Sequence, residues 1–596
     1  MEKFAEFVKR HADASGAVIL FFATLLFFLP GINFSPVPLD DQAYIGAEYL
    51  LFPTWQNFLY HLKTPVLDLY SPLVMHSFML DYLLWGKELL QAGGRFHNIL
   101  LHCLNTVMFF YLLRQIRIVR SSPEKPFTLS LPAAIFGAVC FALHPQRVES
   151  VIWIVERKDV LAIFFGLASM LCFIHSFRKN RLPLAGAILY FLSFGAKPLI
   201  ITLPGVLLLG IWAGTEKFDW KKTLKMLCPY LAAMLFYIGL NAMQLKNFAG
   251  NSAAGVLDWS RLQIVIQNYT FYFFKTIMPL GIQPLYPKFV WNSTTLVLCI
   301  MFWLMTAAVL AAAIIKWKYR NIFLGFAAPL LLIYLGVTLP MAGFKSIGNA
   351  EFTDRYSYFP AMFIWLGMAA LCEYTARRKT NWQYLFPAYA ALIAILGFCC
   401  LQTWQSKESF IVAALGDGKN VHPTALRLAA WSCFENGDFE QAGTFANHAL
   451  VLADDFRREE DELFALGMQG LIELKQNNLN GLAKLDAAVT TPAWGRFMYS
   501  SIGFAERVLM TAAEYHLKIN TPQDVEFARQ CYLVLADIST GRDPLKELSF
   551  QAYAAYLAKD YVLAEQLTGK ALQLSPNDKV LLDDAAFYRK KAADTN

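Results

Sequence analysis

The sequence predicts an all-α membrane protein in two parts, and three observations lead to this fold class. The chain is 56% hydrophobic and only 16% charged, which is too apolar for an ordinary soluble protein. Long apolar runs alternate with short basic links over residues 1–403. Residues 404–596 have shorter apolar runs with small residues at regular spacing, which favours a soluble array of stacked helices.

The apolar runs of the first part are long enough to be membrane spans. A bilayer core of about 30 Å requires roughly 20 apolar residues per helix. By this criterion we expect about 11 transmembrane helices, at 17–34, 96–114, 129–144, 159–176, 183–196, 199–214, 226–245, 294–315, 321–343, 358–376 and 383–403. Residues 261–279 are interpreted as an interfacial or re-entrant helix, because a further crossing would place one basic link on the opposite side.

The basic residues predict the orientation of these spans. The net charge is +7, and the cations gather in links between apolar runs. These links hold Arg114, Arg117 and Arg120; Arg178, Lys179 and Arg181; Lys217, Lys221, Lys222 and Lys225; Lys316, Lys318 and Arg320; and Arg377, Arg378 and Lys379. With the N-terminus cytoplasmic as an uncleaved first span, all of them fall on the cytoplasmic side. The charge then requires no nucleic-acid partner, and residues 404–596 lie outside the cytoplasm.

Small and aromatic residues in the second part recur at the spacing of tetratricopeptide (TPR) repeats. The positions are Ala430, Gly437, Phe439, Ala442 and Ala449, and then Ala552, Ala555, Tyr561, Ala564, Ala571 and Pro576. Small residues at such positions let paired helices approach and stack. The two intervening units, at 458–492 and 505–540, are degenerate. A generic helical domain without true repeats is the alternative.

Two adjacent acids, Asp40 and Asp41, follow the first span. A carboxylate here could be a general base, bind a metal or cap a helix, and capping is the commoner role of such a pair. The long first outer loop at 35–93 favours a catalytic role, since a base there meets both a lipid-linked donor and an acceptor from outside. The cysteines show no CxxC pair, so the sequence indicates no metal site.

The outer link between the spans 129–144 and 159–176 is densely charged. It contains His144, Arg147, Glu149, Glu156, Arg157, Lys158 and Asp159 around the apolar stretch 151–155. This alternation predicts a short helix that lies on the bilayer and turns its polar face to a cavity. A network of structural ion pairs is the other interpretation.

Two further cations are candidates for binding an anion. Lys197 lies in a tight turn between two spans, with no acid beside it in the sequence, so it could reach the headgroups or meet a lipid phosphate. Arg355 has a forked donor set suited to phosphate, with Tyr356 and Tyr358 near it in sequence. Asp354 and Arg355 could equally form a structural pair.

Four segments together resemble a known family. FHNILLHCLNTVMFFYLLRQ, FALHPQRVESVIWIVERKDVLA, GAKPLIITLP and DRYSYFP are similar, in this order, to signature segments of the transmembrane-and-tetratricopeptide-repeat (TMTC) proteins, especially their bacterial branch. The resemblance implies a GT-C class glycosyltransferase in a bacterial inner membrane. It would move a sugar, with mannose as a candidate, from a polyprenyl-phosphate carrier to a Ser or Thr of a protein or to a glycan. Asp40 and Asp41 match the catalytic acid expected in the first outer loop.

The chemistry of inverting transfer agrees with these residues. A carboxylate takes the proton of the acceptor hydroxyl, and the leaving lipid phosphate needs positive charge and no general acid. Lys197, Arg355, Arg157 and Lys158 are the phosphate-binding candidates. A divalent metal could assist, although no ligand set supports one. A non-catalytic scaffold for cell-envelope assembly or export is the alternative; a transporter would need ionisable residues within its spans, which are almost free of them.

Overall fold

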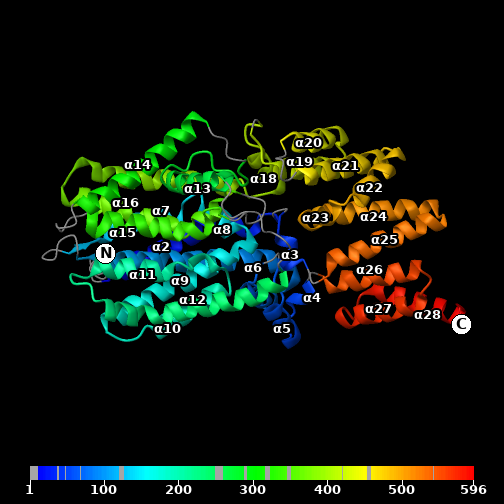
Figure 1. Cartoon of the computed structure of the whole chain (residues 1–596), viewed down its shortest axis with the longest axis horizontal. Helices are drawn as coiled ribbons and strands as arrows, with labels where there is room; N and C mark the ends of the chain where they lie inside the picture. Colours follow the sequence, from blue (N-terminus) through cyan, green and yellow to red (C-terminus); the bar gives the residue numbers. More distant parts are fainter. Residues whose placement is uncertain are drawn as a thin grey trace, which may run out of the picture. The chain divides into compact units, whose positions relative to one another are not determined.

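The computed structural model of the chain describes residues 11–36, 39–46, 48–66, 69–119, 126–248, 259–287, 292–315, 323–344, 351–418, 420–452, 458–540 and 543–595. These residues are almost entirely helical, which confirms the all-α prediction (Figure 1). The sheet found among them is the antiparallel pair β1 (Arg117–Ile118) and β2 (Phe127–Thr128). Three expected cytoplasmic cations, Lys316, Lys318 and Arg320, lie outside the described residues, as does Arg120.

The chain divides into two compact units. One contains Met1–Asp41 and Pro53–Ala413, and the other contains Gln42–Phe52 and Ala414–Asn596. The short helices α3 (Asp41–Ile45) and α4 (Glu48–Leu51) therefore fall at or beyond the edge of the first unit.

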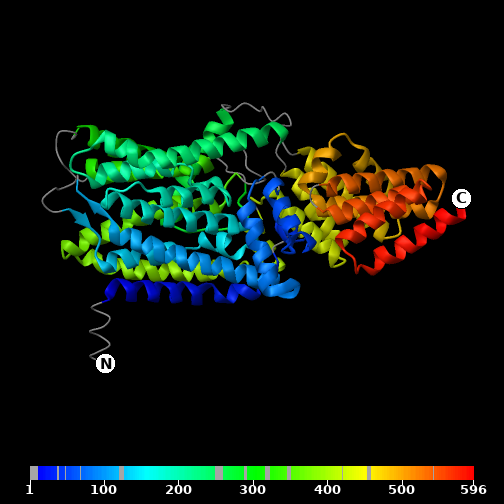
Figure 2. The same cartoon turned by 90° about the horizontal axis from the view of Figure 1, so that it is seen from below.

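Long apolar helices run side by side in the first unit (Figures 1 and 2). They are α2 (Ala12–Phe28), α6 (Pro72–Gln115), α7 (Leu131–Ala142), α9 (Arg157–Arg178), α10 (Leu184–Phe194), α11 (Leu203–Gly214), α12 (Trp220–Phe248), α13 (Trp259–Ile277), α14 (Ser293–Ile315), α15 (Ala328–Thr338), α16 (Pro360–Arg377) and α17 (Leu385–Gln402). Every expected span contains one of these helices. The helix α13 covers the segment interpreted as interfacial, and it packs on α14 and α16.

Six helical stretches of the described chain are long and apolar enough to cross a membrane, judged by length and composition. They are Ala12–Asn33, Pro72–Gln115, Ile154–Arg178, Trp220–Asn241, Ser293–Ile315 and Leu385–Gln402. Four other apolar helices are shorter: Leu131–Ala142, Leu184–Phe194, Leu203–Gly214 and Gly325–Met341. The expected number of crossings and their orientation therefore stay predictions.

Two glycines shape the region around the site. Gly86 has φ 64° and ψ −174°, a conformation that side chains disfavour, and it breaks α6 into two helical pieces. Gly94 follows the break, and a Cβ there would lie 2.5 Å from the Ile154 side chain. A close approach of this kind requires glycine, and it lets α6 pack directly against the charged segment.

The second unit is a succession of helices in which most pack on the next one along the chain. They are α19 (Pro423–Glu435), α20 (Phe439–Val451), α21 (Arg458–Lys475), α22 (Asn480–Thr490), α23 (Trp494–Ser500), α24 (Ile502–Ile519), α25 (Pro522–Ser539), α26 (Pro544–Leu557), α27 (Tyr561–Leu574) and α28 (Lys579–Thr595). The alanines predicted at close helix contacts, including Ala430, Ala442 and Ala564, are fully buried. This burial agrees with stacked helix pairs, and the TPR assignment itself stays a prediction.

Candidate active site

The charged link predicted to lie on the bilayer is instead buried within the protein. It forms the helix α8 (Arg147–Ile152), a short 3-10 turn η2 (Ile154–Glu156) and the start of α9. Trp153 has an extended conformation that separates α8 from η2. The apolar residues between the charges, such as Val151 and Ile152, are fully buried. They pack against protein and not against lipid, because α6, α17 and the turn η6 (Asp354–Ser357) contact α8.

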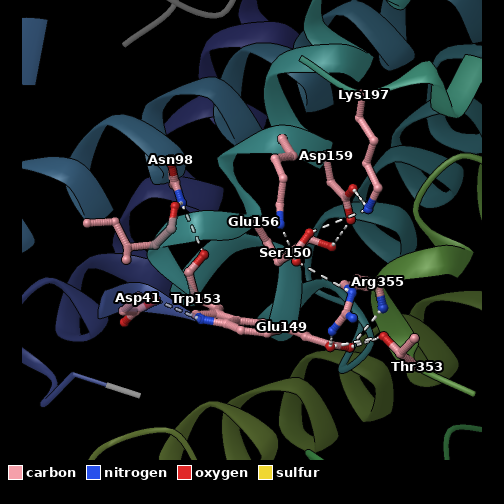
Figure 3. A network of polar contacts seen from close by, with 12 residues as sticks. Asp41, Asn98, Glu149, Ser150, Trp153, Glu156, Asp159, Lys197, Thr353 and Arg355 are labelled. Carbon is pink, nitrogen blue, oxygen red and sulfur yellow. Dashed lines mark hydrogen bonds and ion pairs between the residues drawn. The ribbon is translucent and has the colours of Figure 1, made fainter. Parts of the chain in front are cut away.

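Glu149 and Arg355 form a strong pair at the centre of this region (Figure 3). The Arg355 guanidinium lies 2.5 Å from one Glu149 oxygen, and the backbone N–H of Arg355 donates to the other at 2.9 Å. The Thr353 hydroxyl donates to the same carboxylate at 2.9 Å. Burial disfavours the Arg355 cation, yet Glu149 and Glu156 outweigh this and hold the Arg355 pKa above its usual range. The pair therefore stays ionised.

Lys197 lies beside two carboxylates of the same segment (Figure 3). Its ammonium is 2.6 Å from Asp159 and 3.6 Å from Glu156. Burial opposes the charge of Lys197, but the two acids raise its pKa overall. The Tyr356 ring lies between the cations, 5.3 Å from the Lys197 ammonium and 5.3 Å from the Arg355 guanidinium carbon. Such ring contacts stabilise cations that have lost their water.

Asp40 is half-buried beside the cations of this network. Burial raises the Asp40 pKa, and the charges of Lys158 and then Arg355 act in the opposite direction. Lys158 is 3.3 Å from Glu156, which also lies 3.5 Å from Arg355. Asp40 is therefore a carboxylate with partial access to solvent, next to two positive charges.

Asp41 has a different environment, although it is adjacent in the sequence. Only 6% of Asp41 is exposed, and its carboxylate accepts a hydrogen bond from the Trp153 indole N–H at 2.8 Å. Figure 3 shows Asp41 at the edge of the network, on the side of Trp153. The Trp153 ring in turn lies 5.1 Å from the Arg355 guanidinium carbon. The structure thus separates the two acids, one near the cations and one bound to an indole.

Three candidate residues lie away from this cluster. Arg157 turns toward α6, where it contacts Asp81 at 2.5 Å and the Asn98 side chain at 2.7 Å. His144 is fully buried at the end of α7 and accepts the Gln146 N–H at 3.2 Å. Tyr358 points into the helix core, where its hydroxyl lies 2.6 Å from His102. These side chains support the site from behind.

Asp354 belongs to a second buried cluster beside the first. It accepts hydrogen bonds from the Gln146 amide at 3.0 Å and the Tyr286 hydroxyl at 2.9 Å. Burial and the nearby Glu149 raise the Asp354 pKa to about 7, despite those two hydrogen bonds. Asp354 and Arg355 therefore do not pair with each other, because each is held by partners on other elements.

Sequence reasoning missed Asp81, Asn98 and Trp153 as parts of the site. Asp81 is an acid in an otherwise apolar stretch of α6, and that isolation was a usable signal, since a buried acid needs a cation. Asn98 donates to the Ile154 carbonyl at 3.1 Å and accepts from Arg157. No local pattern distinguishes Asn98 or Trp153. Within the described residues, no three His, Cys, Asp or Glu side chains are placed to hold one metal ion.

These features define an all-helical protein with membrane-length apolar helices and a buried, nearly neutral charge network. No family model matches the chain. Over 148 residues it is 28% identical to the human (Homo sapiens) protein O-mannosyl-transferase TMTC4, a stretch that covers 24% of this chain and 20% of that protein. The chain thus matches about one fifth of the length of this curated relative. The similarity agrees with the expected TMTC-like relationship in this part of the chain.

Proposed function

We propose that this protein is a membrane glycosyltransferase of the GT-C class that transfers a sugar from a polyprenyl-phosphate donor, with inversion, to an acceptor outside the cytoplasm. The observation that carries the proposal is the position of Asp40, a half-buried carboxylate beside the cations Lys158 and Arg355. Inverting transfer from a lipid phosphate requires this combination of a base and positive charge. The similarity to a protein named an O-mannosyl-transferase supports mannose as the sugar and a Ser or Thr hydroxyl as the acceptor.

Asp40 is the proposed general base. It takes the proton of the acceptor hydroxyl while the hydroxyl oxygen bonds to the anomeric carbon, and the bond from that carbon to the phosphate oxygen breaks. The bonding electrons leave with the phosphate, which is a weak base and needs no proton. A raised pKa makes Asp40 a stronger base than an exposed aspartate, provided that it is ionised at the working pH.

Arg355 and Lys158 are the proposed phosphate contacts. Of the cations in the network Arg355 has the most exposed side chain, at 17%, against 9% for Lys197 and 8% for Lys158. Fixed cations in a site with little water stabilise a leaving anion more strongly than exposed ones do. Lys197 acts as a positioning residue, because its ammonium is already bound by Asp159 and Glu156.

Asp41 is the proposed positioning partner of the base. Its hydrogen bond from Trp153 fixes the indole ring, and that ring packs against Arg355. The loss of Asp41 would therefore disturb the phosphate side of the site without removing the base.

The remaining assignments follow from this proposal. The membrane is a bacterial inner membrane, the N-terminus is cytoplasmic, and the helical unit 414–596 is a periplasmic TPR-like module that holds an acceptor protein or glycan. A divalent metal is not needed for the mechanism, because Arg355 and Lys158 supply the positive charge.

A second candidate is a non-catalytic scaffold, favoured by the mutual neutralisation of Glu149, Glu156 and Asp159 by Arg355, Lys158 and Lys197. Ion pairs of this kind also occur where their role is purely structural. A scaffold would tolerate loss of Asp40, since that acid is at the edge of the network and makes no direct ion pair within 4.0 Å among the described residues.

The deciding experiment makes Asp40→Asn and Asp41→Asn separately and measures sugar transfer and donor binding in both. We expect Asp40→Asn to lower transfer by about 10²–10⁴-fold while the donor still binds. Asp41→Asn should weaken donor binding and retain measurable transfer. Wild-type transfer rates in both variants would refute the proposed mechanism.

A further inference from the structure

A crevice of about 570 Å³ lies between the end of α16 and the start of α17. It is distant from the candidate active site, because α16 begins just after Arg355 and its 18 residues extend about 27 Å. This length is close to the thickness of a bilayer core. The crevice therefore belongs to the opposite membrane face from the charge network, whichever face that is.

The walls of the crevice are apolar and fixed by packing. Met368 and Leu371 form the α16 side, and Phe386 and Tyr389 form the α17 side. The Phe386 ring packs edge-on against Phe136 of α7 at 5.0 Å between ring centres. The Tyr389 hydroxyl donates to the Ile277 carbonyl of α13. A volume of this size with preformed walls is in the range of small-molecule binding sites.

One end of the crevice carries the cation Arg378. Its neighbour Arg377 is already engaged, at 2.6 Å from Glu373 and 2.8 Å from the Thr128 carbonyl. Arg378 is exposed and contacts the Tyr374 ring at 5.2 Å. In the described part of the chain, no carboxylate lies within ion-pair distance of Arg378. The site is thus a set of apolar walls with a cation at the rim that has no acidic partner there.

We propose that this crevice binds an anionic phospholipid, with an acyl chain between α16 and α17 and the phosphate at Arg378. The charge at the rim complements a lipid phosphate, and basic pockets between membrane helices are suited to such headgroups. Leu371 and Leu385 are 49% and 56% exposed, so the crevice continues into apolar surface. A soluble anion would not need this surface, whereas a lipid chain covers it.

The experiment is native mass spectrometry of the purified full chain, titrated with phosphatidylglycerol and, separately, with phosphatidylcholine. We expect the wild type to bind phosphatidylglycerol about fivefold more tightly, the usual contribution of one cation near an anionic headgroup. Arg378→Gln should abolish this preference. Lys379→Asn is the matched control: it also removes one cation, does not line the crevice, and suits the positive φ of 52° at that position. It should leave the preference intact.

A second variant separates the crevice from a general surface charge. Leu371→Trp keeps every cation and fills the space between the helices, so it should weaken binding of both lipids. Equal binding of the two lipids by the wild type would overturn the proposal. So would an unchanged preference in Arg378→Gln, or unchanged binding in Leu371→Trp, since either result would place the lipid elsewhere.

Discussion

The ammonium of Lys197 lies 2.6 Å from a carboxylate oxygen of Asp159, a residue 38 positions earlier in the chain. The sequence suggested a lone cation available for phosphate, because no acid is near Lys197 in the turn 195–198. In the structure, Asp159 and Glu156 already neutralise it. The charge of Lys197 therefore holds two buried acids in place, and any phosphate must rely first on Arg355 and Lys158.

Replacing Lys197 with methionine should destabilise the protein. The change leaves Asp159 and Glu156 buried without their main cation, and breaking a buried ion pair from one side typically costs about 3–5 kcal/mol. We expect a clearly lower melting temperature, measured by thermal unfolding in detergent. The exposed Lys217→Met is the matched control and should melt like the wild type. If Lys197→Met melted like Lys217→Met, the pairing would have no energetic importance.

Replacing Arg355 with lysine should weaken donor binding while preserving the fold. Lysine keeps the positive charge but cannot donate to Glu149 and remain available to a phosphate through a planar fork. We expect an increase in the donor KM of roughly tenfold, the scale of one lost charge-assisted hydrogen bond. Lys158→Arg, which preserves both charge and donors, is the comparison variant. An unchanged donor KM in Arg355→Lys would remove Arg355 from the proposed phosphate site.

The helices of this protein could be predicted well from sequence because their signal is local. The expected spans 294–315 and 383–403 correspond to Ser293–Ile315 and Leu385–Gln402. A run of apolar residues determines such a helix almost alone. The break at Gly86 was not expected, because a single glycine inside a helical pattern is often tolerated and only its φ shows the bend.

The site could be predicted only in its membership. The charged link and the DRYSYFP segment do meet, since Glu149 pairs with Arg355 across 206 positions. The direction of each side chain could not be inferred, because partners such as Asp81 for Arg157 come from a helix brought close by the break in α6. The different environments of Asp40 and Asp41 likewise depend on Trp153, which lies 112 positions from Asp41.

The buried Asp354 should make stability depend on pH. Its pKa is raised from 3.8 to about 7, so the folded state retains a proton that the unfolded state has released between these values. Stability from this group is present below about pH 4 and is lost progressively as the pH rises to about 7. We expect Asp354→Asn, which cannot ionise, to gain stability relative to the wild type over this interval.

The measurement is the difference in melting temperature between Asp354→Asn and wild type at pH 5, 6 and 7. Using the difference cancels the other titrating groups that the two proteins share. The difference should shift in favour of the variant at each higher pH. A constant difference would mean that Asp354 ionises in the folded protein as easily as in the unfolded chain.

The orientation in the membrane gives the last prediction. Positive-inside placement puts Lys217 in the cytoplasm and the unit 414–596 outside, and only this arrangement keeps the basic links on one side. Lys217 and Lys579 are both exposed, so Lys217→Cys and Lys579→Cys should be accessible thiols where the medium reaches them. The exposed native thiols Cys228 and Cys399 are first replaced with serine. In intact cells with a permeable outer membrane, an impermeant maleimide should modify the thiol at 579 and spare the one at 217. Labelling at 217 alone would reverse the orientation, and it would place the candidate active site on the cytoplasmic face, where an acceptor outside the cytoplasm cannot reach it.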